Sequence, residues 1–334
     1  MWYLGNLKIE GKVILAPMAG VTSEGYRRYM NSFGCNLCYT EMVSDMGIIY
    51  ENKETEDYVK FEKDVCPTGV QLFGNNPANL AKAALKCMQM NPNIDFFDVN
   101  MGCPVNKVTK SGSGSAVMKD SKNAGEIIRA IKEATKLPVT AKIRLGFDEV
   151  NFMDVIRELE NAGVDAIAIH ARTRKELYYG EPHYDLIENL QSKMTVPLIV
   201  SGNIFTVEDA VNALNRTGAT AVMIARGGIG NPLLIKDLQD VLNGKEKTST
   251  YTFNQQKQMC IELADSLIKE KGETIAMRIY RSIAPKFFSG FPNSKSLRVK
   301  LASRMTTYKS MLDILNDFEN TDMRDFWLYL VKSI

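Results

Sequence analysis

The chain has 334 residues, an apolar fraction of 45% and a formal net charge of +2 at pH 7. A chain of this length and composition buries a large core, which excludes a disordered or fibrous protein. No apolar run approaches the roughly 18 residues of a membrane span, and the first residues lack a basic segment followed by an apolar one. We therefore expect a cytoplasmic protein without a membrane anchor.

Six cysteines are spread over the chain, at Cys35, Cys38, Cys66, Cys87, Cys103 and Cys260. Without a secretory signal, they are expected to be free thiols. Cys35 and Cys38 form a C-x-x-C pair, but no second pair and no nearby histidine completes a zinc site. We interpret this pair as structural and expect no bound metal.

Apolar segments typical of buried strands alternate with helical segments along most of the chain. The predicted strands are Val13 to Pro17, Leu37 to Glu41, Gly69 to Phe73, Phe96 to Asn100, Val139 to Arg144, Ala166 to His170, Pro197 to Ser201 and Ala221 to Ala225. Among the segments between them, we predict amphipathic helices over Pro77 to Met90, Ser121 to Thr135 and Val207 to Asn215, with N-caps at Asn76, Asp120 or Ser121, and Thr206.

Eight strand–helix units in about 240 residues are typical of a TIM (β/α)8 barrel. A doubly wound sheet is the alternative, but no G-x-G-x-x-G motif opens a helix after the first strand. The pattern changes after Gly244, where a polar stretch precedes helical segments without β alternation. We therefore predict an α/β barrel over residues 1–244 and an all-helical domain over 245–334.

The charge is distributed unevenly between these two parts. Residues 245–334 carry 15 basic against 10 acidic residues, whereas residues 1–244 carry 26 against 29. Between positions 274 and 312 there is no acidic residue, but there are eight basic ones: Arg278, Arg281, Lys286, Lys295, Arg298, Lys300, Arg304 and Lys309. Such a run is usually a solvated helix face. Beside a barrel with a reactive site, it favours a polyanion-binding surface, with nucleic acid as the first candidate.

A single cysteine follows the fourth predicted strand, in the loop Asn100-Met101-Gly102-Cys103-Pro104. In a barrel, side chains at the C-terminal strand ends point into a mouth built from loops, which is where reactive groups lie. Most cysteines are small buried hydrophobes. The polar loop residues Lys107 and Lys110, however, suit a loop that closes over a substrate. We therefore interpret Cys103 as functional.

The other predicted strands end in further candidates for the mouth: Ala16, Pro17, Met18, Glu41, Gln71, Lys142, Arg144, His170, Arg172, Arg174, Ser201, Gly202, Asn203, Ala225, Arg226, Gly227 and Gly228. Two adjacent glycine-bearing turns after strands seven and eight indicate a phosphate-bearing cofactor, although single glycine turns are common. Lys142 lies in a buried strand pattern and needs an opposite charge, either a ligand or a neighbouring carboxylate. His170 is either a core histidine or a donor to the cofactor, and Gln71 binds either a cofactor edge or the backbone.

Several motifs together identify a resemblance: Ala16-Pro-Met-Ala-Gly-Val-Thr22, Gln71-Leu-Phe-Gly74, Asp98-Val-Asn-Met-Gly-Cys-Pro104, Lys142-Ile-Arg-Leu-Gly146 and Ile169-His-Ala-Arg-Thr-Arg174. With these, nearly the whole chain resembles the flavin-dependent tRNA-dihydrouridine synthases, most closely the bacterial B-type branch. Two turns depart from the family pattern. Ser201-Gly202-Asn203 stands where Asn-Gly-Asp is usual, and Ala225-Arg226 stands where Gly-Arg is usual.

The resemblance implies an enzyme with FMN as cofactor, NADPH as electron donor and tRNA as substrate. We expect the protein to be a monomer. It implies that Cys103 is the proton donor and that FMN is bound by Ala16, Pro17, Met18, Gln71, Lys142, His170, Ser201, Gly202, Asn203, Ala225 and Arg226. Contacts with tRNA are expected from Asn100, Lys107, Arg144, Arg172, Arg174, Arg281 and Arg298.

The implied chemistry agrees with these residue types. The C4 carbonyl polarises the uracil C5=C6 bond, so hydride from the reduced flavin N5 adds at C6 and a proton adds at C5. A thiol with a pKa of about 8.5 is protonated at neutral pH and can supply that proton. One alternative is an FMN barrel for a free pyrimidine, as in dihydroorotate or dihydropyrimidine dehydrogenases, which the basic stretch disfavours. Another is an RNA-binding protein without catalysis, which Cys103 and Lys142 disfavour.

Overall fold

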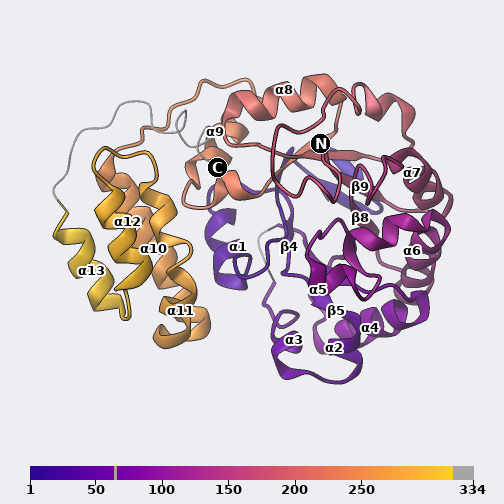
Figure 1. The fold of residues 1–334 in the computed structure, drawn as a ribbon, viewed down its shortest axis with the longest axis horizontal. Coiled ribbons are helices and arrows are strands. Elements are labelled where there is room, and N and C mark those ends of the chain that lie inside the picture. Colours follow the sequence, from indigo (N-terminus) through magenta and orange to yellow (C-terminus); the bar gives the residue numbers. More distant parts are fainter. Residues whose placement is uncertain (64–65, 319–334) are drawn as a thin grey trace.

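The computed structural model describes residues 1–63 and 66–318. Its centre is a ring of parallel strands in the spatial order β3 (Val13–Leu15), β11 (Ala221–Ile224), β10 (Leu198–Ser201), β9 (Ala166–His170), β8 (Val139–Arg144), β7 (Phe96–Met101), β6 (Thr68–Phe73) and β4 (Cys38–Tyr39). A parallel bridge from Ile14 to Leu37 joins the two ends of this order. The Leu15 N–H also donates to the Leu37 carbonyl at 3.0 Å. The predicted TIM barrel is therefore confirmed (Figure 1).

All eight predicted strands are present, with ends that differ from the prediction by no more than two residues. The second strand is interrupted, because Tyr39 of β4 pairs with Gly69 whereas Val43 of β5 (Val43–Ser44) pairs with Leu72. The interrupted strand thus carries one residue more than its partner over this stretch, which makes a bulge. Met42 lies in the bulge and reaches the mouth of the barrel.

Helices surround the strands: α1 (Glu24–Asn31), α2 (Asp45–Ile49), α3 (Lys53–Asp57), α4 (Pro77–Met90), α5 (Asn106–Thr109), α6 (Ser121–Thr135), α7 (Phe152–Asn161), α8 (Val207–Thr217) and α9 (Leu233–Leu242). The bounds of α4 and α6 are those predicted, and α8 is two residues longer. Each starts at a predicted cap, since Asn76, Asp120 and Thr206 accept hydrogen bonds from backbone N–H groups of the first turn.

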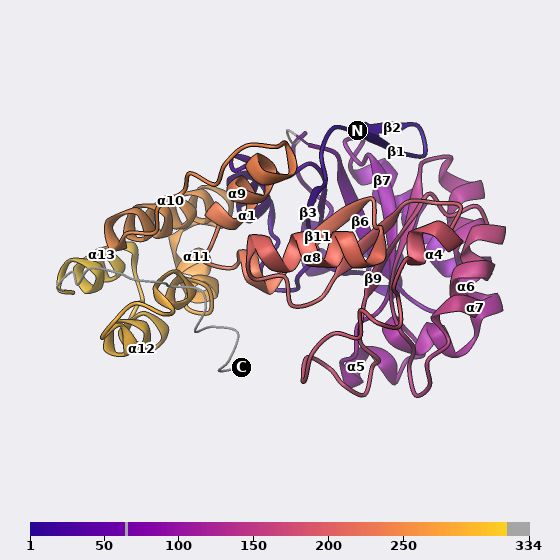
Figure 2. The ribbon, with the colours of Figure 1, turned by 90° about the horizontal axis from the view of Figure 1, so that it is seen from above.

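An N-terminal hairpin, β1 (Trp2–Leu4) and β2 (Leu7–Ile9), closes one end of the barrel and was not predicted. Its apolar residues share a core with inward-facing barrel residues, namely Trp2, Leu4 and Ile9 with Ile14, Ala16, Leu37, Tyr39, Phe96, Ala166, Ala168, Ile199, Ala221 and Met223. Figure 2 shows the hairpin at one end of the strands and α5 at the other. The hairpin therefore leaves the opposite end, where the strands have their C-termini, as the mouth.

The helical region comprises α10 (Phe253–Lys271), α11 (Glu273–Tyr280), α12 (Lys295–Ser303) and α13 (Tyr308–Asn316), beside the barrel (Figure 1). It is joined to α1, where Glu270 Oε2 accepts from Gly25 N at 2.7 Å and from Ser23 Oγ at 2.8 Å. One apolar cluster continues from barrel residues into the helical region. The division at residue 244 stays a prediction, and residues 319–334 of the predicted second domain lie outside the described part.

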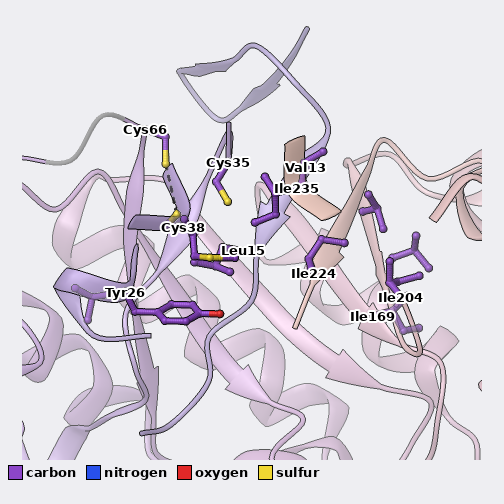
Figure 3. Packing of buried hydrophobic residues seen from close by; sticks show 14 of the residues in the cluster. Val13, Leu15, Tyr26, Cys35, Cys38, Cys66, Ile169, Ile204, Ile224 and Ile235 are labelled. Atoms are coloured by element: carbon purple, nitrogen blue, oxygen red, sulfur yellow. Dashed lines mark hydrogen bonds between the residues drawn. The ribbon is translucent and has the colours of Figure 1, made fainter. Parts of the chain in front are cut away.

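Three thiols meet inside this apolar cluster. Cys38 and Cys66 lie with their sulfur atoms 3.5 Å apart, and Cys35 is close by (Figure 3). Burial raises the pKa of the Cys38 thiol well above its usual range. Over residues 1–63 and 66–318, no group of His, Cys, Asp or Glu side chains is arranged to hold a metal ion. In the same part of the chain, no helix has the length and apolar character of a membrane span.

Candidate active site

A cavity of about 560 Å³ opens at the C-terminal ends of the strands. This volume is in the range of small-molecule and cofactor sites. Every residue predicted to bind the cofactor lines it: Ala16, Pro17, Met18, Gln71, Lys142, His170, Ser201, Gly202, Asn203, Ala225 and Arg226. Cys103 lines it too, as do Asn100, Lys107 and Arg144. The fold thus brings together residues from seven of the predicted strand ends. Glu41, at the end of the second, does not line the cavity and accepts from Gly20 N instead.

The loop that carries Cys103 is held on both sides of the thiol. Asn100 Oδ1 accepts from the N–H of Cys103 at 2.8 Å and from that of Gly102 at 3.1 Å. Ser115 donates from N at 3.0 Å and from Oγ at 2.9 Å to the Cys103 carbonyl. Gly114 has φ +61°, and a Cβ there would lie 2.9 Å from the same carbonyl. Cys103 is half-buried, whereas the other five cysteines are buried. The site therefore presents one accessible thiol on a fixed backbone.

Lys142 stands in the wall of the cavity as a cation that pairs with no described residue. Burial, reinforced by the neighbouring Arg144, lowers its pKa to about 8. Among the described residues, its ammonium makes no hydrogen bond and no ion pair. Asp98 is the carboxylate that acts on it electrostatically, but that carboxylate is hydrogen-bonded to Gln71 and Thr140. Of the two expectations for Lys142, this arrangement favours a ligand anion in the cavity.

His170 is neutral in this setting. Burial and then the nearby cations, led by Arg144, hold its pKa well below the usual range. Arg172 Nη1 lies 3.1 Å from His170 Nε2. Because a guanidinium only donates, Nε2 is the acceptor and the ring proton sits on Nδ1. His170 thus has one N–H to offer a ligand.

Two buried arginines hold the loop after β9 in place. Arg144 donates from Nη1 to the carbonyls of Thr173 and Leu177, both at 2.9 Å. Arg172 is completely buried and donates from Nε to Tyr179 O at 3.1 Å and from Nη2 to Gly180 O. Their donors are therefore used mainly inside the protein. Direct contact of either side chain with RNA stays a prediction.

The two glycine turns lie against each other in the cavity wall. Gly202 has φ +129°, a conformation that side chains rarely adopt. A Cβ on Gly227 would lie 2.0 Å from the Ile204 carbonyl, so only glycine allows the turns to approach this closely. Arg226 Nη2 donates to Asn203 Oδ1 at 3.3 Å and links the side chains of the two turns. Backbone and cations thus converge on one side of the cavity.

Comparison with known proteins decides the family. The profile described as "Dihydrouridine synthase (Dus)" matches residues 14–321. The chain belongs to the dihydrouridine synthase family. It is 35% identical over 298 residues to a probable tRNA-dihydrouridine synthase of Rickettsia conorii, covering 88% of this chain and 89% of the relative. It is 30% identical over 299 residues to tRNA-dihydrouridine synthase B of Pseudomonas aeruginosa, covering 89% and 90%.

The fold of this dihydrouridine synthase family member also resembles that of a solved amine oxidase structure. The 6-hydroxypseudooxynicotine amine oxidase of Pseudomonas geniculata superposes with a TM-score of 0.57 at 11% identity, over 96% of this chain and 67% of that one. At this identity the likeness concerns the fold alone.

The dihydrouridine synthase cavity contains residues that were not predicted. Tyr178 contacts two cations, with Arg226 4.7 Å and Arg144 5.5 Å from its ring centre. Phe205 and Met42 complete the apolar wall. Tyr178 is part of the exposed apolar run Leu177-Tyr178-Tyr179, and such a run in a polar loop was the signal that could have found it. The bulge at Met42 left no such signal.

The remaining predicted RNA contacts lie outside the cavity. Arg174 donates to Asn106 Oδ1 at 2.7 Å, which places it beside the Cys103 loop. Arg281 and Arg298 lie in the helical region, where Arg281 Nε donates to the Met305 carbonyl at 2.8 Å. Within the described residues, none of the eight basic side chains between positions 274 and 312 forms an ion pair with an acidic one. No acidic side chain of the described residues therefore neutralises their charge.

Proposed function

We propose that this protein reduces the C5=C6 bond of uridines in tRNA to dihydrouridine, with FMN in the cavity and NADPH as electron donor. We propose further that it acts as a monomer in the cytoplasm. The observation that carries the proposal is the accessible Cys103 thiol, held on a fixed loop over the same cavity as Lys142, which pairs with no described residue. Such a cavity combines a proton donor with a binding site for an anion.

The cavity fits FMN on several counts. Lys142 supplies a cation suited to the N1 and C2 oxygen edge of a reduced flavin, and the neutral His170 supplies one N–H. The paired turns at Gly202 and Gly227 bring backbone and Arg226 together, as a phosphate requires. Gln71 is buried with its amide held by Asp98, so it presents a fixed edge. Bound FMN would supply the hydride.

The protein's own groups would then control the proton and the substrate. Cys103 would donate its thiol proton to C5 of the uracil, and its fixed backbone would keep the thiol on one face of the ring. Asn100, at the end of β7, would act on the substrate through this loop, because its amide already bonds Gln71, Gly102 and Cys103. Lys107 and Arg174 are arranged around the loop of Cys103 and would attract the phosphates near the extruded base.

The basic residues of the helical region favour RNA over a free pyrimidine. A site for a small substrate has no use for eight basic residues outside the cavity, whereas a folded RNA presents phosphates over a wide surface. An RNA-binding protein without catalysis would have no use for the accessible Cys103 thiol in the same cavity as Lys142, which pairs with no described residue.

The test uses purified protein, FMN, NADPH and a tRNA transcript without modifications. We expect dihydrouridine in the transcript by mass spectrometry and NADPH oxidation that depends on the tRNA. Free uracil, orotate and an unmodified single-stranded RNA serve as comparison substrates. Turnover of orotate or uracil in preference to tRNA would replace the proposal by the free-pyrimidine alternative. If the protein purified without flavin and showed no turnover, RNA binding without catalysis would replace the proposal.

A further inference from the structure

Asp98 is a carboxylate inside the barrel that takes no direct part in the proposed reaction. Its side chain is 0% exposed. It lies on β7 between its register partners, Gln71 on β6 and Thr140 on β8. Gln71 Nε2 donates to one carboxylate oxygen at 2.7 Å, and Thr140 Oγ1 donates to the other at 2.5 Å. Burying a carboxylate costs free energy, so packing alone does not account for this residue.

A chain of hydrogen bonds leads from Asp98 to the reactive loop. Because an ionised carboxylate only accepts, Gln71 must turn its NH2 group toward Asp98 and its carbonyl away. That carbonyl accepts from Asn100 Nδ2 at 2.8 Å. Asn100 is thereby oriented with Oδ1 toward the loop, where it accepts from the N–H groups of Gly102 and Cys103.

We propose that Asp98 is a positioning residue that fixes the Cys103 loop through the amide of Gln71. An amide has a donor end and an acceptor end of nearly the same shape, so each amide in the chain has two orientations. The reversed orientation of Asn100 would point its NH2 group at two backbone donors and release the loop. The acceptor oxygen at the far end holds the NH2 group of Gln71 toward residue 98 and thereby favours one orientation for both amides.

The mechanical part of this proposal can be tested without flavin or RNA. Hydrogen exchange of the apo-protein, followed by mass spectrometry, reports the N–H groups of Gly102 and Cys103 in a peptide covering residues 100–108. In Asp98→Ala we expect exchange there to become about tenfold faster, because the loop loses its acceptor. The α8 segment, on another side of the barrel, should exchange as in the wild type.

Two variants separate positioning from general destabilisation. Asp98→Asn can accept from Gln71 with its carbonyl and donate to Thr140 with its amide, so it should restore exchange to near the wild-type rate. The matched control is Asp237→Ala on α9, a residue with 0% exposure whose carboxylate accepts from Tyr251 Oη at 2.9 Å, outside the cavity. It should leave residues 100–108 unchanged.

Unchanged exchange in folded Asp98→Ala would overturn the proposal. An Asp98→Asn protein that exchanges as fast as Asp98→Ala would also overturn it, because the loss of charge, and not the loss of hydrogen bonds, would then explain the faster exchange. Should Asp98→Ala not fold, Gln71→Met cuts the chain one link nearer to the loop and should give the same acceleration. If exchange at residues 100–108 is not faster in Gln71→Met, the proposal is overturned as well.

The functional consequence rests on the proposed function. With pre-reduced enzyme and saturating tRNA, Asp98→Ala should reoxidise about tenfold more slowly because the thiol is misplaced, while the Kd for tRNA stays unchanged because the basic residues that contact its phosphates are untouched. Equal rates in the two proteins would overturn the proposal. A wild-type protein that reduces no uridine would disprove the proposed function instead, and the exchange measurement would still decide the role of Asp98.

Discussion

Arg144 donates from Nε to the carbonyl oxygen of Gly102 at 2.7 Å, one residue before the accessible thiol. The same guanidinium reaches the carbonyls of Thr173 and Leu177 from Nη1. One buried side chain on β8 therefore joins the loops that follow β7 and β9. A planar fork with several donors is needed for this, and an ammonium cannot reproduce it.

Arg144→Lys should therefore loosen the loop at Leu177 while the barrel stays folded. Loss of one buried hydrogen bond costs on the order of 1 kcal/mol, or about a fivefold change in loop opening. Chymotrypsin cleavage after Tyr178 or Tyr179, followed by mass spectrometry, should accelerate by about that factor. Arg157→Lys on α7, an exposed residue paired with Asp154, is the control and should be cut as the wild type. Equal cleavage of all three proteins would show that Arg144 does not hold the loop.

Cys103→Ala should bind FMN and accept electrons from NADPH as the wild type does, yet hardly pass them to tRNA. Removal of a positioned general acid typically slows a reaction by about 10² to 10⁴-fold. The measurement is single-turnover oxidation of pre-reduced enzyme by unmodified tRNA, read from the return of oxidised-flavin absorbance. Cys87→Ala, in the buried face of α4, should lower the melting temperature and leave this rate unchanged. A Cys103→Ala protein with wild-type turnover would transfer the acid role to Lys107, His170 or water.

Lys142→Met should lower the reduction potential of bound FMN, because the reduced ring loses a neighbouring cation. We expect a fall of about 30 mV or more, since about 1.4 kcal/mol corresponds to 30 mV for a two-electron couple. Burial lowers the pKa of Lys142 to about 8, so in the ligand-free protein the cation is present below pH 8 and lost as the pH rises through it. Spectroscopic titration at pH 6.5 should therefore separate wild type and variant, with Lys107→Met, an exposed lysine of the same cavity, as control. A potential that does not differ from the wild type would argue for a purely structural Lys142.

Charge reversal at Arg281 and Arg298 should weaken tRNA binding. Each phosphate contact adds about 0.7 to 0.9 to the slope of log K against log salt, so the double variant should lose about 1 to 2 units of slope. NADPH oxidation without RNA should stay unchanged. Charge reversal at Arg129 and Arg157, on α6 and α7 away from the helical region (Figure 1), is the control. An unaltered slope would mean that the basic stretch is a solvated surface.

Asp98→Asn should stabilise the protein at neutral pH and much less in acid. Burial raises the pKa of Asp98 to about 6 from an ordinary value of 3.8, so the folded state holds the proton more tightly than the unfolded state. The cost of ionising Asp98 is absent below about pH 4 and complete above pH 6, where it reaches about 3 kcal/mol. Thermal melts between pH 4 and pH 7 should show a difference in Tm that grows with pH. A difference that is constant over this range would contradict the assigned pKa.

Local patterns in the sequence were enough for the barrel and for most of the cavity wall. Buried strand segments, caps such as Asn76 and Asp120, and the position of each strand end are properties of short stretches, and parallel strands necessarily bring their C-terminal ends together. That is why every predicted cofactor residue, from Ala16 to Arg226, lies in one cavity. The motif around Cys103 could be recognised in the sequence because it too is one short stretch.

Which groups meet across the barrel was decided by tertiary structure alone. Contacts between distant segments determine the hairpin that fills the opposite end, the bulge at Met42 and the contact of Tyr178 with two arginines. Arg172 appeared in the sequence as a free cation for RNA, but its donors are used by backbone carbonyls and by His170. The spacing of residues along the sequence indicates which strand a polar side chain follows. Only the register between neighbouring strands determines whether its hydrogen bonds end on solvent, on a ligand or, as for Asp98, on another side chain.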